Sequence, residues 1–144
     1  MNKNQRTTYD IIVIDGGITG AGIARDCALR GLKVLLVEKF DMTNGATGRN
    51  HGLLHSGARY AVTDNESATE CIQENMILRK IARHCVEETD GLFITLPEDD
   101  LSYQKTFVTA CQNAGIRADI IAPEEAIRLE PAGSPAADQG CCGL

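Results

Sequence analysis

The sequence predicts an α/β fold that opens with a parallel β–α–β unit, and three observations support this prediction. Ile11 to Ile14 form an uninterrupted β-branched run, as expected of a parallel strand that is covered on both faces. A glycine-rich turn follows at residues 16–20. Beyond Gly31, which ends the intervening helix, Leu32 to Val37 is typical of a second strand. This order of elements defines the α/β class.

The glycine-rich turn has the composition of a phosphate-binding loop. Gly16, Gly17 and Gly20 allow the backbone to turn tightly and to approach a ligand without an intervening Cβ. The helix that starts near Thr19 directs its free N–H groups and its positive dipole end toward the turn, which suits a pyrophosphate. Helix–strand packing also selects glycine, so the turn by itself is a weak signal.

Glu38, immediately after the second strand, strengthens this interpretation. It lies about 20 residues beyond the turn, where a dinucleotide-binding fold places a carboxylate on a ribose hydroxyl. The alternative is a solvated acid at the end of a strand. An acid at this position disfavours the 2′-phosphate of NADP, but it does not distinguish FAD from NAD.

One residue departs from the dinucleotide-binding pattern, which is glycine, any residue, glycine, two residues, glycine. Gly17 and Gly20 fill the last two glycine positions, whereas Asp15 fills the first. Aspartate tolerates unusual backbone angles better than most residues, so the turn can form. Its carboxylate would lie near a negatively charged pyrophosphate, and we therefore expect weakened cofactor binding.

Composition restricts the function classes. The chain has 144 residues, enough for one domain with a core, and hydrophobic and charged fractions of 43% and 24% are those of a soluble globular protein. The net charge of −6 gives no electrostatic reason to bind nucleic acid. The N-terminus is polar, and no apolar run approaches the roughly 20 residues that span a bilayer, which predicts a cytoplasmic protein.

The six cysteines and three histidines show no metal-ligand spacing, so no metal site is predicted. Cys27, Cys71, Cys85 and Cys111 each fall in an expected helix, and we interpret them as buried thiols.

The rest of the chain predicts a loop, three helices and two strands. Residues 41–60 are typical of a loop wrapped round a ligand, because Thr, Arg, Asn and His side chains stand between glycines; a plain surface loop is the alternative. Helices are expected from Asp64 or Asn65 to about Cys85, from 97 to about 111 and at 123–130, and strands at 91–96 and 116–121. Residues 132–144 lack periodicity and are expected to be disordered.

Four segments resemble a known family. Gly16 to Gly31, Gly45 to Tyr60, Ile81 to Val86 and Gly91 to Asp100 are similar to the A subunits of anaerobic glycerol-3-phosphate dehydrogenases. The Gly45 to Tyr60 segment is specific, whereas the first segment is shared by many flavoproteins. The resemblance covers about residues 9 to 131.

This resemblance implies an FAD enzyme with a D-amino-acid-oxidase-like fold, in which a Rossmann-like FAD-binding βαβ unit precedes an α+β substrate domain. Such enzymes oxidise sn-glycerol 3-phosphate to dihydroxyacetone phosphate. They pass the electrons through partner subunits of a membrane-associated complex to quinone. The protein would be cytoplasmic, with peripheral attachment to the inner face of the cell membrane through those partners.

The resemblance also implies roles for individual residues. The turn residues Gly16, Gly17, Ile18, Thr19 and Gly20, with Glu38 and Lys39, would hold the ADP half of FAD, and Thr47, Gly48, Arg49 and Asn50 would line its pyrophosphate and flavin. The candidate catalytic residues are His55, Arg59 and Tyr60, near flavin and substrate. Arg59 is a candidate phosphate contact because its planar guanidinium suits an oxyanion. A structural salt bridge is the alternative for Arg49 and for Arg59.

By analogy the chain divides into an incomplete FAD-binding unit at 8–62, the start of a substrate or cap region at 63–131, and a tail at 132–144 that does not resemble the family. Family members are much longer, so we interpret the chain as a truncated product. We expect it to be poorly stable, to hold FAD weakly and to be inactive alone, since its first strand would have a neighbour on one edge only. The alternatives are another FAD-dependent oxidoreductase of the same fold and a catalytically inactive fragment.

Overall fold

The computed structural model describes residues 7–96, 98–131 and 140–143, the last four by their backbone only. It divides into two compact units, Met1–Leu53 and Leu54–Leu144. A division after residue 62 was expected from the sequence. The structure places it after Leu53, because Ala58 and Ala61 belong to the buried cluster of the second unit.

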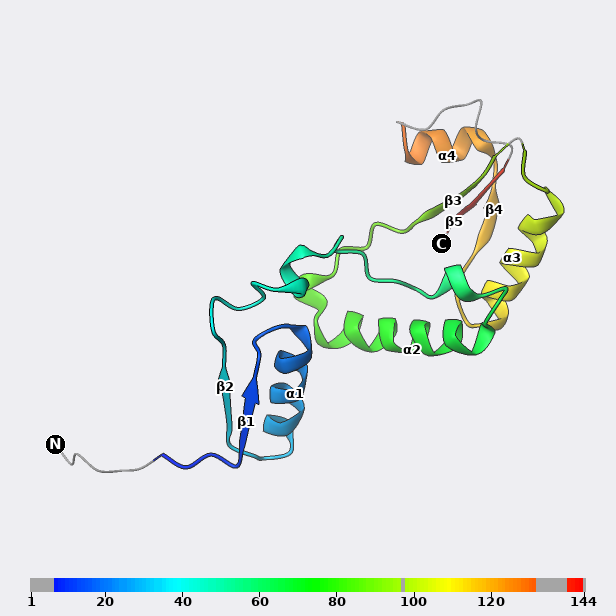
Figure 1. Cartoon of the computed structure of the whole chain (residues 1–144). Helices are drawn as coiled ribbons and strands as arrows, with labels where there is room; N and C mark the ends of the chain where they lie inside the picture. The colour runs from blue at the N-terminus through cyan, green and yellow to red at the C-terminus, as the bar shows by residue number, and fades with distance from the viewer. Residues whose placement is uncertain (1–6, 97, 132–139, 144) are drawn as a thin grey trace. The chain divides into compact units, whose positions relative to one another are not determined.

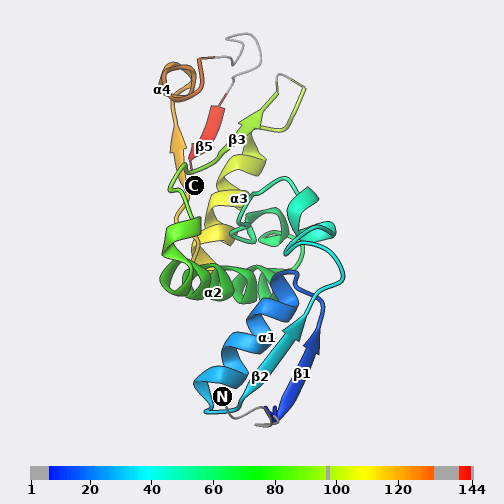
Figure 2. The same ribbon diagram turned by 90° about the vertical axis from the view of Figure 1, so that its left-hand side faces the viewer.

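The first unit is the predicted β–α–β unit (Figure 1). It consists of β1 (Ile11–Ile14), α1 (Ile18–Leu29) and β2 (Val34–Val37), followed by the short 3-10 helix η1 (Ala46–Arg49). The two strands are parallel, with Ile11 opposite Val34 and Ile14 opposite Val37, and Figure 2 shows α1 running beside them. Parallel neighbours require a crossover connection, which α1 supplies.

The prediction that β1 is covered on both faces is wrong. Val13 is 7% exposed, whereas Ile12 and Ile14 on the opposite face are 62% and 81% exposed. The reason is that, within residues 7–53, β1 pairs only with β2 and α1 is the only α-helix, so no element of this range covers the second face of the sheet. A strand with alternate side chains in water gains burial energy from only half of its residues.

The second unit contains α2 (Asn65–Ile81), α3 (Ser102–Asn113) and α4 (Pro123–Leu129), the 3-10 helices η2 (Ala58–Tyr60) and η3 (Arg83–Cys85), and the strands β3 (Leu92–Thr95), β4 (Asp119–Ile121) and β5 (Gly140–Gly143). Of the start signals expected for α2, the structure selects Asp64, whose Oδ1 accepts a hydrogen bond from the Ser67 N–H at 3.0 Å. The helix α3 starts later than predicted. The Asp100 carboxylate accepts from the Ser102 N–H at 2.8 Å and fixes a turn before the helix.

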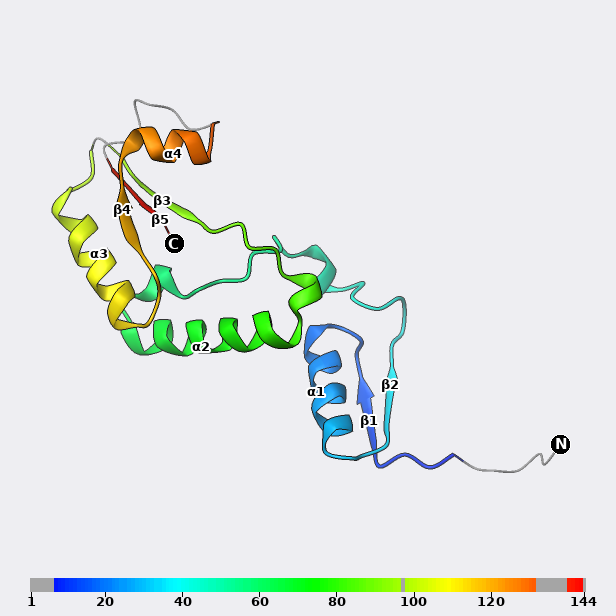
Figure 3. The same ribbon diagram turned by 180° about the vertical axis from the view of Figure 1, so that it is seen from behind.

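The three strands of the second unit form one sheet in the order β3-β5-β4, with β5 antiparallel to both neighbours (Figure 3). Disorder was expected throughout residues 132–144, but Gly140–Gly143 is a strand. Backbone pairing explains the difference, because the N–H and C=O groups of β3 and β4 need partners whatever the side chains of the central strand are. Residues 132–139 and 144 lie outside the described residues.

The core of the second unit is built mainly from small side chains. Its buried cluster comprises Ala58, Ala61, Ala68, Phe107, Cys111, Ala114, Ile116 and Ala118. Of the cysteines expected to be buried, only Cys111 is, whereas Cys27 and Cys71 are half-buried and Cys85 is exposed. Cys85 lies in η3, beyond the end of α2 and outside the buried cluster. None of the helices in the described ranges combines the length and apolarity that crossing a membrane requires.

Candidate dinucleotide-binding site

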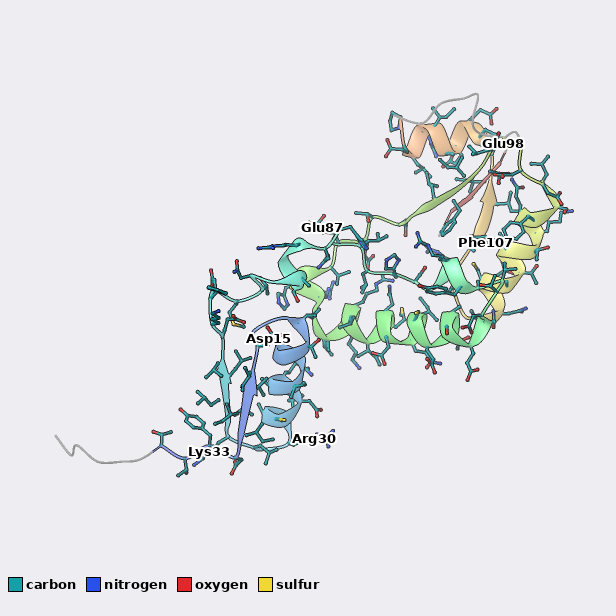
Figure 4. All side chains as sticks on the ribbon, in the orientation of Figure 1. Asp15, Arg30, Lys33, Glu87, Glu98 and Phe107 are labelled. Atoms are coloured by element: carbon teal, nitrogen blue, oxygen red, sulfur yellow. The ribbon has the colours of Figure 1, made fainter. Side chains whose placement is uncertain are left out.

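The turn after β1 begins at Asp15, which Figure 4 labels at the carboxyl end of the strand. Its φ of +100° lies in the left-handed region that glycine adopts without cost. The Asp15 N–H donates to the Val37 carbonyl at 3.0 Å, which extends the pairing of β1 with β2 by one residue. The structure therefore forms the turn with aspartate in the first glycine position, at a backbone angle that favours glycine.

Gly20 is required by close packing. A Cβ added at this position would lie 1.8 Å from the Asp15 carbonyl oxygen, so no larger residue fits without moving the backbone. Gly17 is less constrained, since its Cβ would lie 3.1 Å from Thr47 Oγ1 and 3.2 Å from Asp15 Oδ2. These contacts place the Asp15 carboxylate and the Thr47 hydroxyl at the turn, where the sequence predicts the pyrophosphate.

Glu38 faces the glycine turn. Its Oε2 accepts a hydrogen bond from the Gly16 N–H at 2.7 Å, and its Oε1 accepts one from the Phe40 N–H at 3.0 Å. The Phe40 N–H, followed by the Gly16 N–H, lowers the pKa of this carboxyl below its ordinary value of 4.5. The carboxylate is half-buried and fixed beside the turn, as the ribose interpretation requires, and is not a freely solvated acid.

We expect Glu38 to make the stability of the first unit depend on pH. Because folding lowers its pKa, its contribution is fully present above the ordinary value of 4.5 and is lost as the pH falls through the lower value of the folded state. A Glu38→Gln variant should therefore unfold at lower urea concentration than the wild type at pH 7, and the difference should shrink below about pH 4. Urea midpoints between pH 3 and 7 measure this; a difference that does not change with pH would contradict it.

The amino end of α1 is open to an anion. Its first residue, Ile18, donates its N–H to Thr47 Oγ1 at 3.1 Å, and its N-cap residue, Gly17, has no capping side chain. In the described part of the chain, the N–H groups of Thr19 and Gly20 have no acceptor, and the first turn carries no acid. Two free N–H groups and the positive end of the helix dipole therefore meet at the turn.

The segment that contains Thr47, residues 43–50, is stabilised by contacts within itself. Asn50 Nδ2 donates to the Thr47 carbonyl at 2.6 Å, and a Cβ on Gly48 would lie 2.4 Å from the Thr43 carbonyl oxygen.

The exposed Arg49 forms no ion pair with any described carboxylate, which disfavours the structural salt bridge. The Lys39 ammonium lies over the Phe40 ring, 5.0 Å from its centroid.

The second unit carries the other predicted residues, His55, Arg59 and Tyr60. All three are exposed, and Arg59, like Arg49, has no ion-pair partner within the described ranges. Arg59 lines a cavity of about 490 Å³. Its other walls come from β3, the following turn and α3, and comprise Phe93, Ile94, Thr95, Asp99, Asp100, Tyr103, Gln104 and Phe107.

Neither these walls nor the buried Asn75 were predicted from the sequence to belong to a site. The rings of Phe93 and Phe107 pack at a tilt, with 4.8 Å between their centroids, and Gln104 Nε2 donates to Thr95 Oγ1 at 3.0 Å, so β3 and α3 together shape the cavity. The run Pro97 to Asp100 showed acids before a helix, but nothing in it indicated a cavity. Asn75 did give a signal, because it occupies an apolar position of the helical stripe of α2.

The residues of the first unit fit the ADP part of a dinucleotide. A parallel β–α–β unit, an uncapped helix N-terminus and a carboxylate fixed at the end of the second strand are the parts that bind pyrophosphate and ribose in this class of protein. Within the described ranges, no three His, Cys, Asp or Glu side chains come together closely enough to hold a metal ion. The first unit thus defines a dinucleotide-binding protein.

Comparison with known proteins gives the family. The family model described as FAD dependent oxidoreductase matches residues 10–143. The chain is 68% identical over 136 residues to the A subunit of anaerobic glycerol-3-phosphate dehydrogenase of Escherichia coli (strain K12), covering 94% of this chain and 25% of that protein. It is 57% identical over 121 residues to the A1 subunit of the same enzyme in Haloferax volcanii, covering 84% of this chain and 21% of that protein.

Solved structures show the same fold. Glycine oxidase from Geobacillus kaustophilus matches with a TM-score of 0.71 at 19% identity, over 94% of this chain and 39% of that one. Glycine oxidase from Bacillus cereus matches with a TM-score of 0.63 at 24% identity, over 94% of this chain and 38% of that one. The chain belongs to the family of FAD dependent oxidoreductases.

The predicted fold class and the resemblance to glycerol-3-phosphate dehydrogenase A subunits are confirmed. The family match runs to residue 143, beyond residue 131 where the resemblance was expected to end. The chain spans about a quarter of the length of the curated relatives it matches.

Proposed function

We propose that this chain forms the ADP-binding part of an FAD enzyme that oxidises sn-glycerol 3-phosphate to dihydroxyacetone phosphate. The observation that carries the proposal is the Glu38 carboxylate, held on the Gly16 N–H at 2.7 Å beside the open amino end of α1. When bound, FAD supplies the acceptor for the hydride removed from the substrate. The residues of this chain would bind the cofactor and orient it toward the substrate.

The first unit would hold the two halves of ADP in different ways. Glu38 would accept hydrogen bonds from the ribose hydroxyls, with Lys39 beside it. The free N–H groups of Thr19 and Gly20 would bind the pyrophosphate, together with the neighbouring turn residues Gly16, Gly17 and Ile18 and the loop residues Thr47, Gly48, Arg49 and Asn50. The ribose would meet a carboxylate that is already fixed, and the pyrophosphate would meet backbone donors at the end of a helix. Both sets of groups require little reorganisation on binding.

The second unit would contribute to the substrate site. Arg59 is a cation without an ion-pair partner among the described carboxylates, and it lines the cavity. Its planar guanidinium suits a phosphate better than it suits an uncharged ligand. His55 and Tyr60 are exposed side chains of the same segment. The carboxylate of an amino acid, the alternative substrate for enzymes of this fold, would pair with the same guanidinium, so the titration described below distinguishes the two substrate classes.

Partner subunits belong to the same proposal. The relatives are named as A subunits, so the whole protein would assemble with others, which would carry electrons to membrane quinone and hold it at the inner face of the membrane. The chain would then be a cytoplasmic component. We expect the 144 residues by themselves to bind the ADP moiety weakly and to show no turnover, because the open face of β1 leaves this site on a marginally stable unit.

A comparison of three nucleotides tests the cofactor assignment. FAD and ADP should both bind the purified chain, whereas FMN, which lacks the adenosine ribose and one phosphate, should bind at least about tenfold more weakly. Isothermal titration calorimetry measures all three, and Glu38→Ala should weaken FAD and ADP binding together. Asp26→Asn is a matched control, since Asp26 lies far along α1 and, among the described side chains, forms an ion pair only with Arg30, at 2.7 Å. Binding of FMN equal to that of FAD would contradict the assignment.

The substrate class is tested separately with the same chain. Titration with sn-glycerol 3-phosphate should shift the NMR signals of Arg59 and of the cavity-lining residues, and an equal concentration of glycine should not. Glycine shifting those signals while glycerol 3-phosphate leaves them unchanged would favour an amino-acid oxidoreductase of the same fold.

A further inference from the structure

Asn75 is the only buried polar side chain in the described part of the chain, with 8% of its surface exposed. It lies in the middle of α2, and its Nδ2 donates to two consecutive carbonyls, Leu54 O at 3.3 Å and His55 O at 3.1 Å. A buried amide on a helix costs free energy unless it is paired, and the two backbone carbonyls supply that pairing. That backbone leads directly into the segment that carries Arg59.

Gly57 anchors the same segment on α2 at a point nearer to Arg59. A Cβ at Gly57 would lie 2.7 Å from the Ala68 carbonyl oxygen and 2.7 Å from Cys71 Cβ, and its φ of +89° also favours glycine. The segment therefore touches α2 by its bare backbone. Beyond it, Asn65 Nδ2 donates to the Ala61 carbonyl at 3.1 Å and to the Ala110 carbonyl at 2.9 Å, which ties the far end of η2 to α3.

We infer that Asn75 is a positioning residue: with Gly57 it fixes residues 54–60 on α2 and so holds Arg59 at the cavity wall. The exposed Arg59 has no ion pair with a described residue to hold it there, so its place depends on the backbone that bears it. Only the identity of the ligand that meets Arg59 rests on the proposed function.

The geometry distinguishes this role from ordinary core packing. A residue that only fills space on α2 would be replaceable by an apolar side chain of similar volume. Asn75 instead satisfies two carbonyls, which would lose their donor if the amide were replaced by a carboxylate of the same shape. The effect should appear first in residues 56–61 and not in α3, because α3 is connected to this segment through Asn65 and the apolar cluster instead.

Hydrogen exchange of the whole 144-residue chain tests the inference. In Asn75→Asp, the amides of Ala58, Tyr60 and Ala61 should exchange roughly tenfold faster than in the wild type, while α3 amides change less than about twofold. The Arg59 Nε–Hε NMR signal should move toward its value in an unfolded chain. Asn75→Ala provides a second variant should the aspartate unfold the unit, and Glu74→Gln, an exposed neighbour on α2, is the matched control.

The outcomes separate the inference from the proposed function. Unchanged exchange at Ala58, Tyr60 and Ala61 in both Asn75 variants would overturn the positioning role, as would an equal acceleration across the whole unit. A titration with sn-glycerol 3-phosphate is the second arm. Weaker binding in Asn75→Asp than in Glu74→Gln supports both ideas. The remaining outcome is that the wild-type chain does not bind glycerol 3-phosphate, while the amides of residues 56–61 exchange faster in Asn75→Asp. That outcome contradicts the proposed substrate and supports the positioning role.

Discussion

Replacing Gly20 with alanine should unfold the first unit. The added methyl would lie 1.8 Å from the Asp15 carbonyl oxygen, and that backbone cannot retreat without breaking the hydrogen bond from the Asp15 N–H to Val37. Overpacking against backbone costs about 3 kcal/mol or more, a large share of the stability of any small domain. Hydrogen exchange of the β1 and β2 amides should show complete loss of protection in Gly20→Ala.

The same helix offers a matched control. Gly22 lies two residues further along α1, and a Cβ there meets nothing within 4 Å. Gly22→Ala should raise the free energy of unfolding by about 0.5–1 kcal/mol, because alanine has the higher helix propensity. If the two variants behaved alike, the close approach of α1 to β1 would not be the reason for glycine at position 20.

Replacing Asp15 with glycine should strengthen FAD binding by roughly tenfold. The Asp15 carboxylate lies 3.2 Å from the position of a Cβ on Gly17, within the turn proposed to hold the pyrophosphate. A unit charge about 6 Å from another in a partly solvated site changes the binding free energy by about 1–2 kcal/mol. The substitution also removes a non-glycine residue from a φ of +100°, which should stabilise the unit by about 1 kcal/mol. Calorimetric titration with FAD measures the first effect and urea unfolding the second.

Asparagine at position 15 separates charge from backbone strain. Asp15→Asn keeps a similar side chain at the same φ, so it should gain most of the FAD affinity but little of the stability. The gain in affinity should also shrink at about 1 M salt, where the Debye length falls to about 3 Å. Equal FAD affinity for aspartate, asparagine and glycine at low salt would show that the carboxylate points away from the bound pyrophosphate.

The sequence predicted the first unit closely, because its signals are local. The bounds of β1 match the predicted run, and Gly31 ends α1 with a φ of +83°. A β-branched run followed by glycines and a second apolar run has few other solutions. The sequence also identified Asp15 as the departure from the pattern, and its positive φ is the angle that the pattern reserves for glycine.

The errors arose where burial depends on segments far apart in the chain. The apolar run at β1 predicted cover on both faces, yet Ile14 is 81% exposed, because side-chain chemistry shows what a strand can bury and not what covers it. Residues 140–143 have no strand periodicity, and only the free edges of β3 and β4 make them a strand. The late start of α3 relative to the prediction has a different, local cause, because the Asp100 carboxylate fixes a turn before the helix.

The sequence by itself determined the β–α–β unit, its glycine turn, the carboxylate after β2 and the family, because each depends on residues close together in the chain or on a short pattern. Only the tertiary structure decided that Glu38 bonds the Gly16 N–H, that Thr47 meets the first N–H of α1, and that Asn75 holds the backbone before Arg59. These contacts join residues 20 to 29 positions apart. Their partners are chosen by how the elements pack, which no local pattern specifies.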